Sequence, residues 1–319
     1  MSVFSMRFSW ARITILLVAC VSAGLGLRAA QVDLIKTQAQ EELAIYAKAR
    51  TVVDMTVEEL RRDYPKECDD LEFDDNQAEL NTLLKKTGES VEALFRDIPN
   101  TSSKEQVRRE RLKNNGSVDN ASTQDYFYLV LPGKTVLWEE IRTDDKGRLL
   151  PAASMPGSSF LTSGHAGVAI FFHPLYQESS RFRVLGRQRA ESKAWVIAFA
   201  QKPEEGRPAG RFESELILTT ARIMYQGLAW IDPGTHQILR MRTDLLAPRS
   251  DVLLARQTTE IWYQEVHFAD VPQVFQLPRE VLVTTDWNGQ TYRNRHRYSD
   301  YVVFSVESRD KLEQPRIKK

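Results

Sequence analysis

The stretch from Ile223 to Ser308 constrains the fold most, because it consists of successive strand-like segments joined by short turns. Four segments are rich in β-branched and aromatic residues, as strands are: 223–232, 236–245, 258–268 and 277–287. Asp232-Pro233-Gly234-Thr235 separates the first two, where Pro fixes φ and Gly accepts positive φ. Asn288-Gly289, a strong hairpin signal, predicts a two-residue turn into closing strands over 290–308.

The rest of the chain adds strands in the middle and helices at the front. Residues 126–132 and 135–143 predict one hairpin, and 182–186 with 194–201 predict another. Residues 165–177 fit either a short helix or a strand. About eight to ten antiparallel strands result, and because the helices are grouped at the front, the pattern predicts an α+β fold rather than an alternating parallel one.

A helical region is predicted over residues 30–113. Its clearest segment covers 76–98, where apolar residues recur on one stripe at helical spacing. Gly88 lies inside this segment, so it either weakens the helix or marks a close crossing with another element. The stripe is expected to pack on the β domain, with a groove for a partner helix as the alternative.

Two capping-box patterns mark predicted helix starts in this region. Thr56 with Glu59 and Ser102 with Glu105 have the spacing in which each side chain bonds the other residue's backbone amide. The second pattern predicts a short charged helix that runs through Leu112.

The N-terminus predicts export. Arg7 and Arg12 precede the apolar run 13–27, which has the length of a signal-peptide core and is short for a stable membrane span. Residues 17–20 (Leu-Val-Ala-Cys) resemble a bacterial lipobox, in which Cys20 would be lipidated. Cleavage by an ordinary signal peptidase, after Ala23 or near Ala29, fits the whole run better, and an uncleaved anchor is a further alternative.

These patterns predict five regions. They are a signal peptide over 1–29, a helical region over 30–113, a linker over 114–125, an antiparallel β domain over 126–308 and a basic tail over 309–319. The predicted location is periplasmic or secreted.

Charge and motifs exclude several functions. Lys+Arg and Asp+Glu both total 43, so the overall charge indicates no nucleic-acid partner. The five histidines show no tight ligand spacing, and no nucleophile elbow or phosphate loop is present, so no metal, cofactor or catalytic residue is predicted. Cys68 lies among carboxylates, which disfavour a thiolate, and a nucleophilic role is not expected.

One strand carries an alternating set of cations. Arg293, Arg295 and Arg297 should share a face of their strand, and with nearby tyrosines they could bind phosphate, anionic lipid or polysaccharide. The alternative is the solvated face of a half-buried sheet.

Aromatic residues on separate predicted strands are the other candidate site. Inward-facing tryptophans fill a core or line a ligand cavity. The candidate ligand-binding residues are Trp230, Met241, Trp262 and Trp287.

Part of the chain resembles known periplasmic folds. The runs 227–241, 258–268 and 275–301 resemble the strand pattern of LolA/LolB-like and MucB-like proteins: an aspartate turn with a return strand, an intermediate strand, and Leu-Pro opening a long strand. That resemblance implies a curved, half-open sheet around an apolar cavity for acyl chains or a partner segment. Residues 83–103 and 259–268 are also similar to a family of uncharacterised secreted bacterial proteins.

Together these observations predict an exported α+β protein with N-terminal helices packed on a curved, half-open antiparallel sheet. The first hypothesis for its function is a non-catalytic envelope protein that binds a lipid, lipoprotein or acyl-bearing ligand in a sheet cavity. The alternative is a protein-interaction or sensory subunit of the cell envelope, and an enzyme is the least favoured class. The sequence leaves the oligomeric state open.

Overall fold

The computed structural model describes residues 41, 43–97, 101–132, 138–150, 168–189, 193–205, 210–214, 219–269 and 271–303. The chain divides into two units, Met1–Lys48 and Ala49–Lys319, and in the first of them residues 43–47 are helical. The predicted signal peptide with Cys20 and the predicted basic tail lie outside the described residues. No helix in the described ranges is long and apolar enough to cross a membrane.

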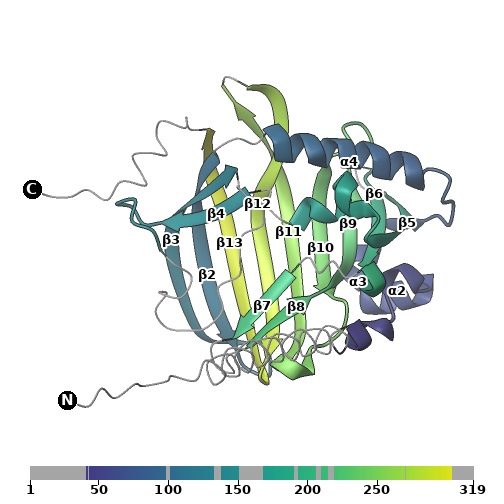
Figure 1. Cartoon of the computed structure of the whole chain (residues 1–319), viewed down its shortest axis with the longest axis horizontal. Helices are drawn as coiled ribbons and strands as arrows, with labels where there is room; N and C mark the ends of the chain where they lie inside the picture. The colour runs from purple at the N-terminus through teal and green to yellow at the C-terminus, as the bar shows by residue number, and fades with distance from the viewer. Residues whose placement is uncertain are drawn as a thin grey trace, which may run out of the picture. The chain divides into compact units, whose positions relative to one another are not determined.

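Antiparallel strands dominate the second unit (Figure 1). Its strands are β1 (Leu71–Phe73), β2 (Thr101–Leu112), β3 (Val118–Pro132), β4 (Trp138–Thr143), β5 (Ser180–Gln188), β6 (Trp195–Gln201), β7 (Gly210–Ser214), β8 (Thr219–Ile223), β9 (Tyr225–Ile231), β10 (Ile238–Leu245), β11 (Leu254–Phe268), β12 (Val271–Trp287) and β13 (Gln290–Val303). Its helices are η1 (Val52–Asp54), α2 (Val57–Asp63), α3 (Pro65–Cys68), α4 (Leu80–Asp97), η3 (Val168–Phe172), α5 (Pro174–Gln177), η4 (Pro203–Glu205) and η5 (Ser250–Val252).

Eleven of the described strands form one sheet, and β7 and β8 form a separate hairpin. The order in the sheet is β1-β5-β6-β9-β10-β11-β12-β13-β2-β3-β4, and every neighbouring pair is antiparallel. The two edge strands, β1 and β4, do not pair with each other, so the sheet is open. The predicted antiparallel sheet is therefore confirmed.

The turns of the meander follow the predicted chemistry. Asp232 accepts hydrogen bonds from the backbone amides of Gly234 (2.9 Å) and Thr235 (2.6 Å), which closes the turn between β9 and β10. Asn288 and Gly289 have φ values of +49° and +73°, as a type I′ turn requires, and they join β12 to β13. Of the stretch 165–177, for which the sequence left a short helix and a strand open, the described residues 168–177 contain the helices η3 and α5.

Two predictions for residues 102–125 were wrong. The expected charged helix through Leu112 is strand β2, and the expected linker is a turn followed by the start of β3. Alternate residues of β2 are buried, and most of them, including Glu105 and Arg109, are polar, with Val107 as an apolar exception. The strand therefore gives little apolar alternation. Pairing with β13 and β3 along both edges overrides the helical propensity of this run.

Strand register divides the sheet into two faces, because direct cross-strand partners point to the same side. The outer face carries Trp230, Arg240 and Arg295, and the inner face carries Met241 and His296.

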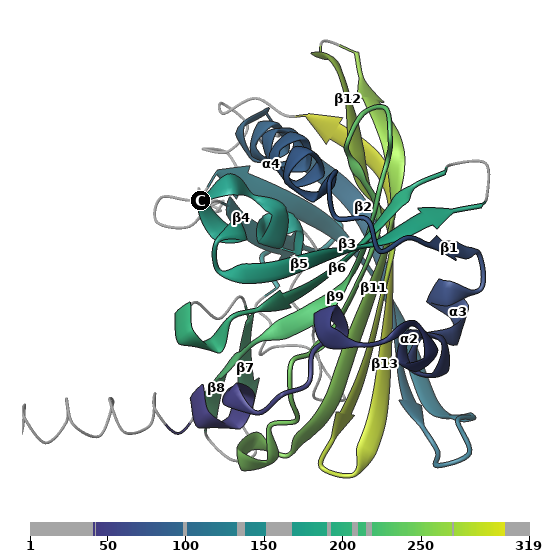
Figure 2. The same ribbon diagram turned by 90° about the vertical axis from the view of Figure 1, so that its right-hand side faces the viewer.

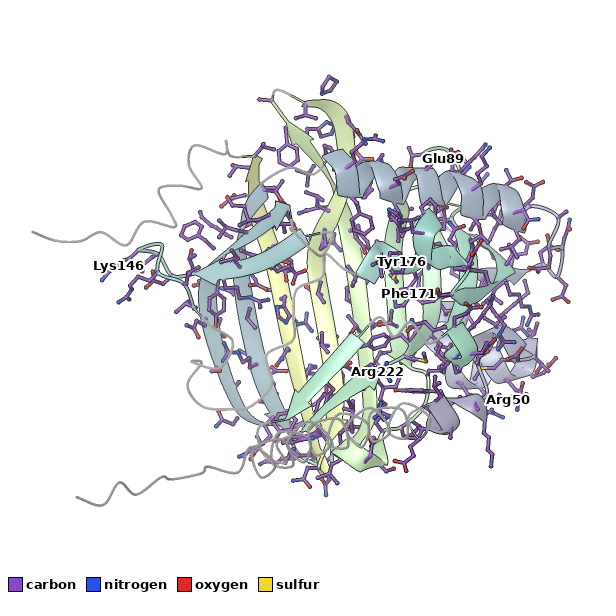
Figure 3. The ribbon with its side chains drawn as sticks, viewed as in Figure 1. Arg50, Glu89, Lys146, Phe171, Tyr176 and Arg222 are labelled. Carbon is purple, nitrogen blue, oxygen red and sulfur yellow. The ribbon has the colours of Figure 1, made fainter. Side chains whose placement is uncertain are left out.

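Strands β5, β6, β9 and β10, which we call the helix-covered half, are packed on both faces (Figure 2). On the inner face, Leu83 and Val91 of α4 and the rings of η3, among them Phe171, cluster with the strands (Figure 3). On the outer face, η1, α2 and α3 supply a second cluster: Val52, Leu60, Tyr64 and Cys68. Each large apolar side chain buried this way contributes about 1.5 to 3 kcal/mol.

Gly88 marks a close crossing, one of the two alternatives that the sequence left open. A Cβ at this position would lie 2.6 Å from Nε2 of Gln177 and 3.2 Å from the carbonyl oxygen of Phe172. Gln177 donates from the same Nε2 to the carbonyl oxygens of Leu84 (2.8 Å) and Phe172 (2.7 Å), so α4, η3 and α5 are held together at this point.

Strands β12, β13, β2 and β3, which we call the charged half, curve so that inner-face residues of distant strands meet. Tyr128 and Val130 of β3 cluster with Ile261 of β11 and Val281 of β12, although β13 and β2 lie between β12 and β3 in the order of the sheet. Side chains of the charged half therefore pack against one another inside the bend.

Candidate functional site

A row of cross-strand partners runs over the outer face from one half of the sheet to the other. Successive register pairs join Trp230 (β9), Arg240 (β10), Trp262 (β11), Glu280 (β12), Arg297 (β13), Gln106 (β2) and Asp125 (β3). Five strands lie between the strand of the first residue and that of the last, so the row exists only because the sheet brings these segments into register.

At the first end of the row, the guanidinium of an arginine lies between two aromatic rings. The guanidinium of Arg240 lies 4.3 Å from the ring centre of Trp230 and 5.5 Å from that of Trp262. It also approaches the buried carboxylate of Glu67 on α3 at 3.3 Å, and Arg242 donates to the same carboxylate at 2.8 Å. Trp230 is 1% exposed. Because Arg240 and Arg242 of β10 both reach Glu67, this end of the row fastens α3 to the sheet.

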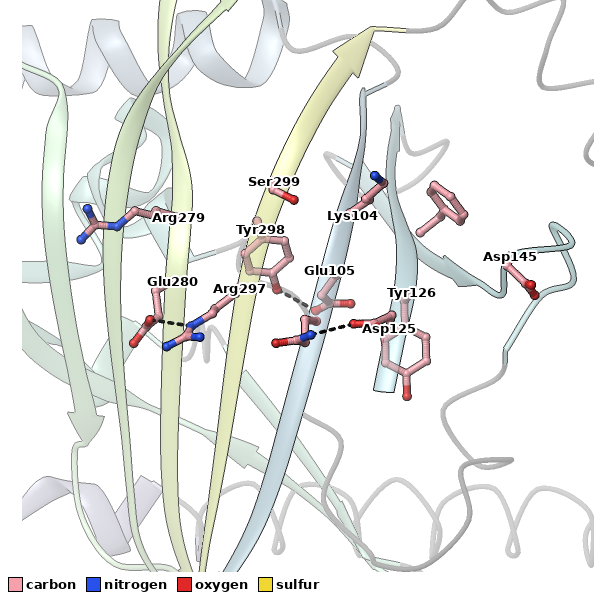
Figure 4. A pocket seen from close by; sticks show the side chains of 12 residues that line it. Lys104, Glu105, Asp125, Tyr126, Asp145, Arg279, Glu280, Arg297, Tyr298 and Ser299 are labelled. Atoms are coloured by element: carbon pink, nitrogen blue, oxygen red, sulfur yellow. Dashed lines mark hydrogen bonds and ion pairs between the residues drawn. The ribbon is translucent and has the colours of Figure 1, made fainter. Parts of the chain in front are cut away.

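The row ends in a half-open hollow of about 760 Å³ (Figure 4). Residues from β2, β3, β12 and β13 and from the turn after β4 line it: Lys104, Glu105, Gln106, Asp125, Tyr126, Phe127, Asp145, Arg279, Glu280, Arg297, Tyr298 and Ser299. Arg297 pairs with Glu280 at 3.3 Å, and Gln106 donates to Asp125 at 3.0 Å. The ring of Phe127 is 40% exposed.

The hollow forms where β12 and β13 separate. Their register ends at Glu280 and Arg297, beyond which the described part of β12 pairs only with β11 and that of β13 only with β2. Pro278 has no amide to donate, and the register between β11 and β12 shifts beside it, at Trp262 and Tyr263. The Tyr301 hydroxyl bridges the split by donating to the carbonyl oxygen of Pro278 (2.8 Å).

A buried ionic cluster adjoins the hollow on the inner face of the sheet, and two of its members, Glu105 and Tyr298, also line the hollow. One oxygen of Glu105 accepts hydrogen bonds from Arg142, His296 and Tyr298, each at 2.8 Å. Burial by itself raises the pKa of Glu105, but the hydrogen bonds from Arg142 and His296 outweigh it, and the pKa lies well below its ordinary value of 4.5. Burial raises the pKa of Tyr298, so its hydroxyl keeps its proton.

The structure separates the four predicted ligand-binding residues. Trp230 and Trp262 lie on the outer face, whereas Met241 is buried on the inner face among the residues under α4. Trp287 packs elsewhere on the inner face, against Phe212, and its indole donates to the carbonyl oxygen of Val252 at 3.0 Å. The four therefore line no common cavity, and a ligand-binding role for any of them stays a prediction.

The predicted anion-binding residues share the outer face, and each has a carboxylate partner. Arg293 donates to Glu110 at 2.7 Å, and Arg295 and Arg297 both pair with Glu280, at 2.9 and 3.3 Å. Arg297 is the one that lines the hollow. Anion binding by this set also stays a prediction.

His173 and Cys68 have side chains that could take part in catalysis or metal binding, but both have structural roles. His173 caps α5 by accepting from the amide of Leu175 at 3.2 Å, and burial lowers its pKa. Burial raises the pKa of the Cys68 thiol to about 11, which disfavours a thiolate at neutral pH. No group of three metal-ligating side chains occurs in the described part of the chain.

The hollow was not predicted from the sequence. Pro278 inside an otherwise strand-like run was the one available signal, because proline in a central strand indicates an interruption. The charged residues of the hollow come from two pairs of strands that are far apart in the chain, β2 with β3 and β12 with β13, and from the turn after β4. Their meeting depends on register.

No protein-family model matches this chain, and no curated protein matches it. A solved DUF1329 family protein from Desulfovibrio piger matches 70% of this chain and 92% of its own at 11% identity, with a TM-score of 0.39. A putative outer membrane lipoprotein-sorting protein domain from Vibrio parahaemolyticus matches 74% and 97% at 12% identity, with a TM-score of 0.31. The Pseudomonas aeruginosa MucA/MucB complex matches 68% and 94% at 16% identity, with a TM-score of 0.22.

These solved structures include the LolA-like and MucB-like proteins that the strand pattern resembles, so that resemblance is confirmed. At such TM-scores it carries no argument about function.

Proposed function

We propose that this chain is an exported, non-catalytic binding protein of the bacterial cell envelope that holds a protein partner in the hollow. The observation that supports this most is the lining of the hollow, where Lys104, Arg279 and Arg297 alternate with carboxylates around the exposed ring of Phe127. A polypeptide surface offers both signs of charge together with apolar side chains, so it complements such a lining. The charged N-terminal residues and the apolar run after them support export.

The same lining disfavours an acyl chain. A hydrocarbon in the hollow would displace water from several charged groups without replacing their hydrogen bonds, and such desolvation is costly. A peptide segment can instead pair with those groups, and Phe127 can anchor against an apolar side chain of the partner.

An acyl-bearing ligand is the second candidate, and a different feature favours it. A void of about 20 Å³ lies between α4 and the sheet, lined in part by Val91, Leu94, Ile238, Tyr263 and Phe275. The hydroxyl of Tyr263 is buried without a hydrogen-bond partner among the described residues. This volume holds about one water molecule. An acyl chain would therefore require α4 to move away from the sheet.

Site-specific photo-crosslinking in the native envelope tests the first proposal. A photoreactive phenylalanine analogue replaces Phe127, and the control carries it at Leu253, an exposed position on the turn before β11. We expect a protein adduct from position 127 that is absent from position 253. Reversing two charges of the hollow, with Arg279→Glu and Arg297→Glu, should remove it.

An adduct that forms equally from both positions, or that survives the double charge reversal, would contradict a partner in the hollow. Far-ultraviolet circular dichroism of the double variant checks that its fold is intact. The fold should be retained, because Arg279 is exposed and the side chain of Arg297 is 60% exposed.

A further inference from the structure

The hairpin of β11 and β12 extends beyond its neighbours and forms a two-stranded arm (Figures 1 and 2). We define the arm as residues 264–268 of β11 and 271–277 of β12. The described pairing of β10 with β11 ends at Trp262, and that of β12 with β13 ends at Glu280. Within the arm the two strands therefore pair with each other and with no other described strand.

The two edges of the arm differ in their capacity to accept another strand. The β12 edge is bounded by Pro272 and Pro278, which cannot donate a backbone hydrogen bond, and proline commonly protects an exposed edge in this way. The β11 edge contains no proline between Gln264 and Phe268. Its backbone groups are therefore able to pair with a further strand.

We propose that the β11 edge of the arm is a self-association site, at which a second copy of the chain adds the same edge in antiparallel orientation. In a two-fold arrangement centred on Val266, each Glu265 lies opposite His267 of the partner subunit. Both residues are exposed and alternate residues share a face, so the pairing places an acid beside an imidazole twice. The edge is thus complementary to itself in backbone and in side chains.

Because the edge is short, we expect the dimer to be weak. Five residues from each copy bury less surface than a stable complex needs, so the dimer forms at high protein concentration and dissociates on dilution. The surface is separate from the hollow, which lies on β2, β3, β12 and β13. Self-association would leave the hollow free for a different partner.

Sedimentation equilibrium of the full mature chain over a wide concentration range tests the proposal. The wild type should pass from monomer to dimer, and Glu265→Lys, which places a cation opposite His267 of the partner subunit, should weaken association by roughly tenfold. A variant that carries both Glu265→His and His267→Glu restores the two acid–imidazole pairs and should recover the dimer. Glu204→Lys changes the net charge equally at an exposed position of η4 and is the matched control.

A chain that stays monomeric at all concentrations overturns the proposal. So does a dimer that Glu265→Lys and Glu204→Lys weaken equally, because general charge would then account for it. Capture of an extended segment of another protein by the arm, with the chain itself monomeric, also overturns it. Proline within an edge strand disfavours the addition of a further strand, so Val266→Pro should abolish the dimer in a chain whose circular dichroism is unchanged.

Discussion

The two halves of the sheet place their charged residues in opposite settings. In the helix-covered half, Arg240 and Arg242 lie beneath α3 and share the buried carboxylate of Glu67. In the charged half, Arg293 and Arg295 stay on the solvent side of the sheet and pair with carboxylates of neighbouring strands. The same alternation of arginine along a strand therefore fastens a helix in one half and forms a solvated surface in the other.

The difference arises because helices cover the sheet in one half, whereas no described helix covers the outer face of the other half. Where η1, α2, α3 and α4 cover the sheet, both faces are filled and a buried charge must be neutralised by a partner. Where no described helix covers the outer face, the charges remain hydrated and can exchange an internal partner for an external one. This is why we place the binding surface in the charged half.

The largest effect is expected from Glu105, the buried exception in the charged half. Glu105→Gln leaves Arg142 and the surrounding donors without a carboxylate, and loss of one member of a buried ion pair typically costs about 3 to 5 kcal/mol. Urea unfolding measures the loss. Glu280→Gln on the solvated face is the control and should cost less than about 1 kcal/mol. Equal losses would contradict the contrast between buried and solvated charge.

The pH dependence of this cluster has a defined sign. The pKa of Glu105 in the folded state lies below the ordinary value of 4.5, so its contribution is fully present above that pH and is lost as the pH falls towards the folded pKa. The unfolding free energy of the wild type should decrease more steeply below pH 4.5 than that of Glu105→Gln. Parallel profiles for the two proteins would show that Glu105 is not the titrating group.

A nearly equal effect is expected at Trp230, in the helix-covered half. Trp230→Ala removes a buried indole from the cluster under α2 and α3, and such truncations cost about 3 to 5 kcal/mol. Trp262→Ala, in the same row but half-buried, should cost only about 1 kcal/mol. Chemical denaturation compares them. A Trp230→Ala protein of wild-type stability would show that this residue is not part of the core.

A smaller effect is expected at the crossing of α4 and α5. Gly88→Ala gains about 1 kcal/mol of helix propensity, but the new methyl group displaces Gln177, and the net change should be a loss of about 1 kcal/mol. Combining Gly88→Ala with Gln177→Ala removes the clash, so a double-mutant cycle should show a favourable coupling between the two changes. Simple additivity of the two single effects would rule out this contact.

The smallest effect is expected on the solvated face. Arg295→Gln removes one exposed partner of Glu280 and should change stability by less than about 1 kcal/mol. Because salt screens exposed pairs, the difference from wild type should shrink further in 1 M salt. Thermal unfolding at two salt concentrations measures this. A loss above 2 kcal/mol would place Arg295 with the buried charges instead.

The sequence predicts local features of this fold better than long-range ones. The Asp232 turn, the Asn288-Gly289 turn and the helix predicted within 76–98 depend on neighbouring residues, and all three are found, the helix as α4 (Leu80–Asp97). Strand β2 was mistaken for a helix because several of its buried side chains are polar, and one of them, Glu105, finds its partners on β4 and β13. The row from Trp230 to Asp125 depends on the register of seven strands, which local patterns do not specify.

Native mass spectrometry of the protein purified from its own envelope fraction tests the central claim most directly. The measurement compares the wild type with the variant carrying Arg279→Glu and Arg297→Glu. If the solvated hollow holds a protein partner, the wild type carries an additional polypeptide mass that the variant lacks. A lipid bound equally by both proteins, with no additional polypeptide, would contradict this account and would favour an acyl-bearing ligand.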